Sequence, residues 1–186
     1  MNKCKFLIGV GIVIFACSIA QASIISFDCY FPDDPYGYDH NWDYDFVIQR
    51  LTIAERLYEK PLSEGDRVRM SGATDSGTTF TLIKTITNTT GVTWTAYDLE
   101  LISNATFIDG TAGSTKFGTH SFSDDFKILH FYSPLSVLNG EVVTLQVDIN
   151  IPTTGLFDFT MAQHPLPEPA SIMLIGLGAL LLRKRK

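Results

Sequence analysis

The clearest structural signal in the chain is an uninterrupted alternation of apolar and polar residues, Val143-Thr144-Leu145-Gln146-Val147-Asp148-Ile149-Asn150-Ile151. Successive side chains of a β-strand point to opposite faces, so residues two apart share a face. The apolar positions of this run therefore line one face, and the polar positions line the other. Such a run is typical of a strand that packs one face on a core and exposes the other to water.

Segments of similar composition surround this run. They predict strands at 79–88, 92–102, 127–132 and 156–161, and shorter strands at 24–27, 46–53 and 67–70. Turn-forming residues separate these segments at intervals of roughly 8–12 residues, which is typical of β-sandwiches and barrels. We therefore predict a single all-β domain over residues 23–162, specifically a β-sandwich of the jelly-roll or immunoglobulin-like type.

Three local features refine this prediction. Residues 88–91 end in Gly91, which tolerates a positive φ, so they predict a hairpin between the strands at 79–88 and 92–102. The apolar face of the second strand changes parity near Ala96 and Tyr97, which predicts a β-bulge there. Residues 51–59 also fit one short helix.

The N-terminal segment has the three parts of a signal peptide. Lys3 and Lys5 are followed by an apolar stretch over residues 6–16 and by the small-residue site Ala20-Gln21-Ala22. We predict a signal peptide over residues 1–22, cleaved between Ala22 and Ser23. A rival lipoprotein cleavage would leave Cys17 as the first residue, although Phe15 fits that site poorly.

Export has a consequence for the cysteines. Cys4 and Cys17 leave with the signal peptide, so Cys29 alone remains and cannot form an internal disulfide. We expect the fold to be held by its core, with Cys29 either buried as a small hydrophobe or exposed as a thiol.

The C-terminal segment has a different order of parts. A Pro-rich linker at 163–169 precedes an apolar run over residues 170–182, and the basic tail follows, consisting of Arg183, Lys184, Arg185 and Lys186. Thirteen helical residues cover roughly 20 Å, against about 30 Å of bilayer hydrocarbon, so a span needs snorkelling or local thinning. We predict a single membrane helix whose basic tail stays cytoplasmic and anchors the precursor.

This C-terminal segment resembles a known sorting signal. The motif Pro167-Glu168-Pro169, the short Gly- and Leu-rich span and the basic tail together resemble the PEP-CTERM signal of Gram-negative bacteria. The resemblance implies recognition of Pro167, Glu168 and Pro169 by an exosortase, removal of the tail, and delivery to the cell surface or exopolysaccharide matrix. It also implies that Arg183, Lys184, Arg185 and Lys186 retain the precursor in the membrane.

The charge of the domain excludes some partners. Six of the 14 basic residues lie in the two terminal segments, so the region between them carries a net charge of about −12. Such a surface repels phosphate backbones, and we expect no nucleic-acid binding. The expected partners are signal peptidase and exosortase during export, the membrane for the precursor, and exopolysaccharide.

Residues 28–45 are rich in carboxylates and aromatic rings, which suggests a binding site as the alternative function. Alternate oxygen ligands at Asp39, Asn41, Asp43 and Asp45 resemble part of a calcium loop, but Tyr44 stands where the turn glycine belongs. Tyr38, Trp42 and Tyr44 are candidate stacking surfaces for sugars. A solvated acidic loop and rings packed over the domain are the simpler interpretations.

Signatures of catalysis are missing from the sequence. No nucleophile elbow, zinc-protease motif or phosphate loop occurs, and the four histidines, His40, His120, His130 and His164, are dispersed. We therefore expect no enzymatic activity and no cofactor. The sequence favours an exported surface or matrix protein with a structural or interaction role, associated with exopolysaccharide or biofilm.

Overall fold

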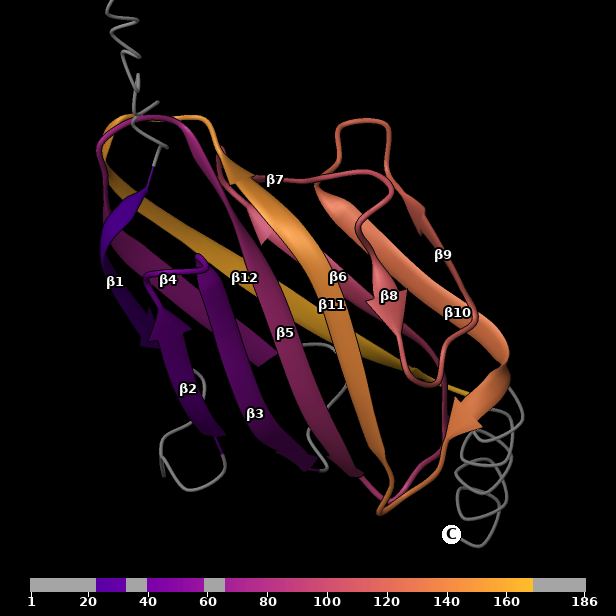
Figure 1. Cartoon of the computed structure of the whole chain (residues 1–186). Coiled ribbons are helices and arrows are strands. Elements are labelled where there is room, and N and C mark those ends of the chain that lie inside the picture. Colours follow the sequence, from indigo (N-terminus) through magenta and orange to yellow (C-terminus); the bar gives the residue numbers. More distant parts are fainter. Residues whose placement is uncertain (1–22, 33–39, 59–65, 169–186) are drawn as a thin grey trace, which may run out of the picture.

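The computed structural model describes residues 23–32, 40–58 and 66–168, and this part of the chain is all-β (Figure 1). Its strands are β1 (Ile24–Tyr30), β2 (His40–Asp45), β3 (Arg50–Tyr58), β4 (Asp66–Thr74), β5 (Thr78–Thr89), β6 (Trp94–Ile102), β7 (Thr106–Phe107), β8 (Gly113–Ser114), β9 (Thr119–Phe122), β10 (Ile128–Val137), β11 (Val142–Ile151) and β12 (Gly155–Pro167). Within the described ranges no helix is long and apolar enough to cross a membrane. The predicted signal peptide and C-terminal membrane helix lie outside the described residues.

The strands form two sheets, visible as two layers in Figure 1. Sheet A has the order β1-β4-β12-β6-β10-β9, and sheet B has the order β2-β3-β5-β11-β7, with β8 also paired to β11. The pair β3–β5 is parallel, with Ile53 opposite Lys84. The other pairs given for the two sheets are antiparallel.

The chain passes repeatedly from one sheet to the other. β3 belongs to sheet B, β4 to sheet A, β5 to sheet B and β6 to sheet A. The hairpin predicted at 88–91 is therefore wrong, because β5 and β6 lie in different sheets. Gly91 does adopt a positive φ, at 80°, but the turn that it makes is a crossover between sheets.

The inward faces of both sheets form one hydrophobic core. Phe27 of sheet A stacks on Tyr44 of sheet B with ring centroids 4.4 Å apart, and Phe80 of sheet B lies 6.4 Å from Phe159 of sheet A. Gly72 of β4 permits close packing beside them, because a Cβ there would lie 2.1 Å from the Ser26 carbonyl oxygen. The two sheets therefore pack face to face, as expected for an all-β domain without disulfides.

Several sequence predictions can be compared directly with these strands. The alternating run at 143–151 is confirmed as β11, with its apolar positions buried. The strand predicted at 46–53 is wrong at its start, since residues 46–49 form the turn between β2 and β3. Residues 51–58 are strand, so the alternative of a short helix is also wrong. A register irregularity between Trp94 and Ala96 accompanies the predicted change of parity in β6.

The last strand continues beyond the predicted end of the domain. β12 runs to Pro167, with Gln163 opposite Asp66 of β4 and Leu166 opposite Ala96 of β6. Residues 163–167 are therefore part of sheet A, and the predicted linker over them is wrong. Among the described residues, β12 pairs only with β6 beyond Gln163, and the prolines at 165 and 167 lie in this part of the strand. Proline lacks the N–H that a second ladder would need.

Candidate functional site

The motif Pro167-Glu168-Pro169 begins inside the folded domain. Pro167 ends β12 opposite Trp94, and the Glu168 backbone N–H donates to the Thr93 carbonyl oxygen at 3.1 Å. Pro169 and the basic residues 183–186 lie outside the described residues. Pro167 is thus part of sheet A, and the Glu168–Thr93 hydrogen bond extends the contact with the domain by one residue.

The other predicted processing site lies at the opposite end of the molecule. Ser23 directly precedes β1, and Figure 1 places the start of β1 far from the end of β12. The Ser23 backbone N–H donates to Asp75 Oδ1 at 2.9 Å. This hydrogen bond is the main reason that the pKa of Asp75 lies below its usual value. Ala22 lies outside the described residues.

Nine of the 18 residues in the predicted acidic loop, 28–30 and 40–45, belong to two strands, and their strand positions argue against the calcium hypothesis. Asp28 belongs to β1, while Asn41, Asp43 and Asp45 occupy alternate, exposed positions of β2. Side chains two residues apart on a strand are separated by roughly 6–7 Å, so these oxygens do not converge on one cation. Asp39 lies outside the described residues, and the described part of the chain contains no group of ligands that fits a metal ion.

The aromatic residues of β2 pack inward. Tyr44 is 7% exposed, and its hydroxyl donates to Gln49 Oε1 at 3.0 Å. Burial, aided by the nearby Asp45 carboxylate, raises the pKa of Tyr44. Trp42 is half-buried against the core, and its ring centroid lies 6.3 Å from that of Phe27. The predicted sugar-stacking role is therefore wrong for Tyr44 and unsupported for Trp42, whereas Tyr38 lies outside the described residues.

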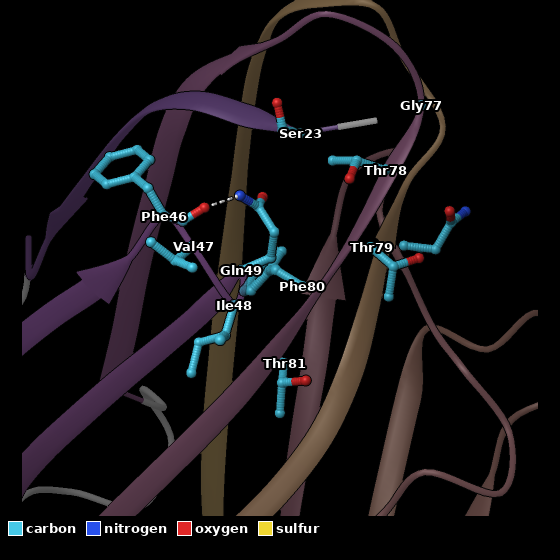
Figure 2. A pocket seen from close by; sticks show the side chains of 11 residues that line it. Ser23, Phe46, Val47, Ile48, Gln49, Gly77, Thr78, Thr79, Phe80 and Thr81 are labelled. Atoms are coloured by element: carbon cyan, nitrogen blue, oxygen red, sulfur yellow. Dashed lines mark hydrogen bonds between the residues drawn. The ribbon is translucent and has the colours of Figure 1, made fainter. Parts of the chain in front are cut away.

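A hollow of about 510 Å³ lies between the β2–β3 turn and the start of β5, and Figure 2 shows the side chains that line it. Its lining includes the apolar turn residues Phe46, Val47 and Ile48 together with threonines of β5. Gln49 has a φ of 51° and donates from Nε2 to the Phe46 carbonyl oxygen at 2.7 Å. The lining contains no Asp, Glu, Lys, Arg, His or Cys side chain.

Four polar side chains meet between the sheets. We call Glu55, Lys84, Tyr97 and Gln163 the inter-sheet polar cluster; the first two come from sheet B and the last two from sheet A. Lys84 Nζ lies 2.8 Å from Glu55 Oε2, and Gln163 Nε2 donates to the same oxygen at 3.2 Å. The Tyr97 hydroxyl donates to Gln163 Oε1 at 2.6 Å. All four residues are at most 6% exposed.

Sequence reasoning missed this cluster, although the sequence contains a signal for it. On β5, Lys84 interrupts an inward row formed by Phe80, Leu82 and Ile86. On β3, Glu55 stands in the corresponding row with Leu51, Ile53 and Leu57. A charged residue at an inward position of each of two strands predicts a buried pair, because an isolated buried charge is too unfavourable.

Cys29 is buried, which confirms the first of the two alternatives that the sequence left open, a buried small hydrophobe. Its side chain is 6% exposed, and burial raises its pKa to about 12. The charges of Asp28 and Glu55 raise the pKa further, whereas Lys84 opposes them. The thiol therefore stays protonated at neutral pH and is not a nucleophile there.

Two of the dispersed histidines come together on the outer face of sheet A. His130 and His164 lie opposite Asp98 on its two neighbouring strands. The His130 Nδ1 atom contacts Asp98 Oδ1, and His164 Nε2 lies 3.8 Å from Glu100 Oε2. The spacing of His130 and His164 in the sequence did not indicate that they lie on either side of Asp98, because this arrangement depends on which strands pair.

Comparisons with models of protein families, with curated proteins and with solved structures return no match.

Proposed function

We propose that this chain is an exported structural protein that an exosortase sorts to the cell surface or extracellular matrix through Pro167-Glu168-Pro169. In this proposal signal peptidase cleaves between Ala22 and Ser23, and the membrane segment 170–182 with its basic tail holds the precursor until the tail is removed. The domain acts without catalysis, as a surface or matrix component associated with exopolysaccharide. Its two face-to-face sheets support assignment as a β-sandwich, of either the jelly-roll or the immunoglobulin-like type.

The observation that carries this proposal is the position of the fold between the two processing segments. β1 begins at Ile24, two residues after the predicted cleavage at Ala22, and β12 ends at Pro167, the first residue of the motif. The two segments that we interpret as sorting signals therefore lie directly before and directly after the folded strands. This arrangement fits a domain that keeps all its strands when both segments are removed.

The contact at Ser23 supports the N-terminal cleavage. Cleavage after Ala22 converts the Ser23 backbone N–H into a terminal ammonium group, which already faces the Asp75 carboxylate at 2.9 Å. A charged donor makes a stronger hydrogen bond with a carboxylate than a neutral amide does. The processed end therefore fits its surroundings better than the unprocessed chain does.

The charge of the domain suits a structural role in a polymer matrix. The domain is acidic as a whole, which keeps it soluble among anionic polymers. A stable sheet framework is what a surface or matrix component requires.

Replacing the motif carboxylate tests the proposal. Glu168→Ala removes the only ionisable side chain between Pro167 and Pro169. We expect the variant to accumulate in the inner membrane with its C-terminal segment attached, and the released form to fall at least tenfold. Immunoblotting of membrane, surface and medium fractions from the native host measures both.

The control for this experiment is Asp124→Ala, which removes an exposed carboxylate from the turn before β10. We expect Asp124→Ala to be processed and released like the unchanged protein. Equal release of Glu168→Ala and Asp124→Ala would contradict the proposed role of the motif.

A further inference from the structure

The inter-sheet polar cluster contains the parts of a self-catalysed amide exchange. We propose that Lys84 Nζ attacks the side-chain carbonyl carbon of Gln163 and forms an intramolecular isopeptide bond, with release of ammonia. Glu55 moves the protons, and the Tyr97 hydroxyl stabilises the carbonyl oxygen. This inference is independent of the sorting proposal.

The nucleophile and the electrophile are brought together by one carboxylate oxygen. Glu55 Oε2 contacts both Lys84 Nζ, at 2.8 Å, and Gln163 Nε2, at 3.2 Å. The two nitrogens are therefore at most about 6 Å apart. The proposed reaction requires the long Lys84 side chain to rotate until Nζ reaches the amide carbon. Holding the two reacting groups in one site replaces a bimolecular encounter by an intramolecular step.

The Tyr97 hydroxyl is positioned on the oxygen that becomes negative during the attack. It donates to Gln163 Oε1 at 2.6 Å, from an inward position on the strand next to β12. A hydrogen-bond donor aimed at a developing oxyanion in a water-excluded site is a large contribution to catalysis of acyl transfer. Tyr97 itself is 0% exposed, so its hydroxyl acts without competition from bulk water.

The proton transfers balance without any external reagent. A proton passes from Lys84 to Glu55, which leaves a neutral amine and a carboxylic acid. The amine adds to the Gln163 carbonyl carbon, and Glu55 then protonates the departing amide nitrogen while accepting a proton from the attacking nitrogen. The C–N bond to ammonia breaks, the new C–N bond to Lys84 remains, and Glu55 is again a carboxylic acid.

The hydrogen bonds of the unlinked site favour the linked product. A lysine ammonium has three N–H donors, yet within the described residues Nζ forms an ion pair with Glu55 Oε2 and has no hydrogen bond of good geometry. Glu55 Oε1 also accepts no hydrogen bond from the described residues. A secondary amide at this place has a single N–H, which Glu55 can accept, so the product removes a buried charge and two unused donors.

A permanent buried ion pair is the competing explanation of the same contacts. It predicts that Lys84 and Gln163 keep their free side chains and that nothing is lost from the chain. The two explanations therefore differ in the mass of the protein.

The test is mass spectrometry of the full chain after expression and purification, read under denaturing conditions. We expect an intact mass about 17 Da below that of the recovered polypeptide, which is the mass of one ammonia. We expect proteolysis to yield a branched peptide that joins the Lys84 segment to the Gln163 segment. Full-mass linear peptides containing free Lys84 and free Gln163 would overturn the proposal.

Peptide mapping also separates this reaction from two others. Succinimide formation at Asn139-Gly140 also releases ammonia, but it gives a linear peptide. Peptide mapping would then locate the 17 Da loss at Asn139 and contradict the proposal. A link between Lys84 and Glu55 would release water, about 18 Da, and would contradict the role of Gln163.

Two variants test the chemistry, and one controls for it. In Glu55→Gln the proton carrier is lost while the side-chain shape is kept, and in Lys84→Met the nucleophile is lost; we expect the 17 Da deficit to disappear in both. Lys116→Met breaks the surface ion pair with Glu141, 3.0 Å long, and should leave the deficit unchanged. The primary result is the mass of the unchanged protein. The proposal can therefore still be contradicted if one of the variants fails to fold.

Discussion

Replacing Trp94 with alanine is expected to lower the free energy of unfolding by about 4 kcal/mol, the largest loss that we expect from a single core substitution in this domain. Trp94 is 0% exposed at the start of β6 and packs against Tyr97, with ring centroids 5.8 Å apart. Its indole N–H donates to Thr90 Oγ1 at 3.1 Å. Alanine leaves a cavity and removes one hydrogen-bond donor from the Thr90 hydroxyl, which still donates to Asn88 Oδ1.

Urea unfolding of the purified protein measures this effect as a lower transition midpoint with an unchanged slope. Trp94→Phe is the matched control, since it keeps a ring and loses the N–H donor, and we expect it to lose about half as much stability. If Trp94→Ala and Trp94→Phe unfold at the same urea concentration, the packing of Trp94 does not stabilise the domain as described.

Replacing Asn88 with alanine is expected to lower the free energy of unfolding by about 3 kcal/mol or more, although it removes only a small polar side chain. Asn88 is 0% exposed. Its Nδ2 donates to the carbonyl oxygens of Val92 and Val137, at 2.8 and 2.9 Å. Its Oδ1 accepts from the Thr90 hydroxyl and backbone N–H, at 2.7 and 3.1 Å. Alanine leaves these groups without their partner at the crossover between the sheets.

Asn139→Ala is the control for this prediction. Asn139 is exposed, and its Oδ1 accepts one hydrogen bond from the Gly91 backbone N–H at 2.9 Å. We expect a loss below about 1 kcal/mol, since water can replace an exposed partner. A comparable loss in Asn88→Ala and Asn139→Ala would show that burial of the Asn88 hydrogen bonds is not what stabilises the crossover.

The all-β class was predictable because alternation is a local property. Residues 143–151 specify a strand by themselves, and the structure confirms it. Sheet membership is not local: the Gly91 turn has the residues of a hairpin, yet Asn88 bonds to Val137 and directs the chain across to the other sheet. A turn's sequence sets its backbone conformation, whereas distant contacts decide where the next strand pairs.

The candidate sites were predictable to different degrees. In residues 40–45 the rings of Trp42 and Tyr44 alternate with Asn41, Asp43 and Asp45, which is a strand pattern, but the density of carboxylates suggested a binding loop. The inter-sheet polar cluster has a sequence signal in Lys84 and Glu55, each within an apolar row. Their meeting with Gln163 and Tyr97 depends on the packing of two sheets, which no local pattern determines.

The two proposals concern the same strand. β12 carries Gln163 within the core and, four residues later, Pro167 of the motif. A covalent link from Lys84 to Gln163 would fasten the last strand to sheet B immediately before the sorting motif. A domain pulled at its C-terminal end would then transmit the force through a covalent bond, which would suit the surface role proposed above.

The most direct test of the central claim is the intact mass of the protein recovered from the medium and envelope of its native host. The account predicts a chain that begins at Ser23 and lacks the residues after the Pro167-Glu168-Pro169 motif, with any additional mass due to attached glycan or lipid. A chain that retains residues 172–186 in the surface or medium fraction would contradict sorting by an exosortase.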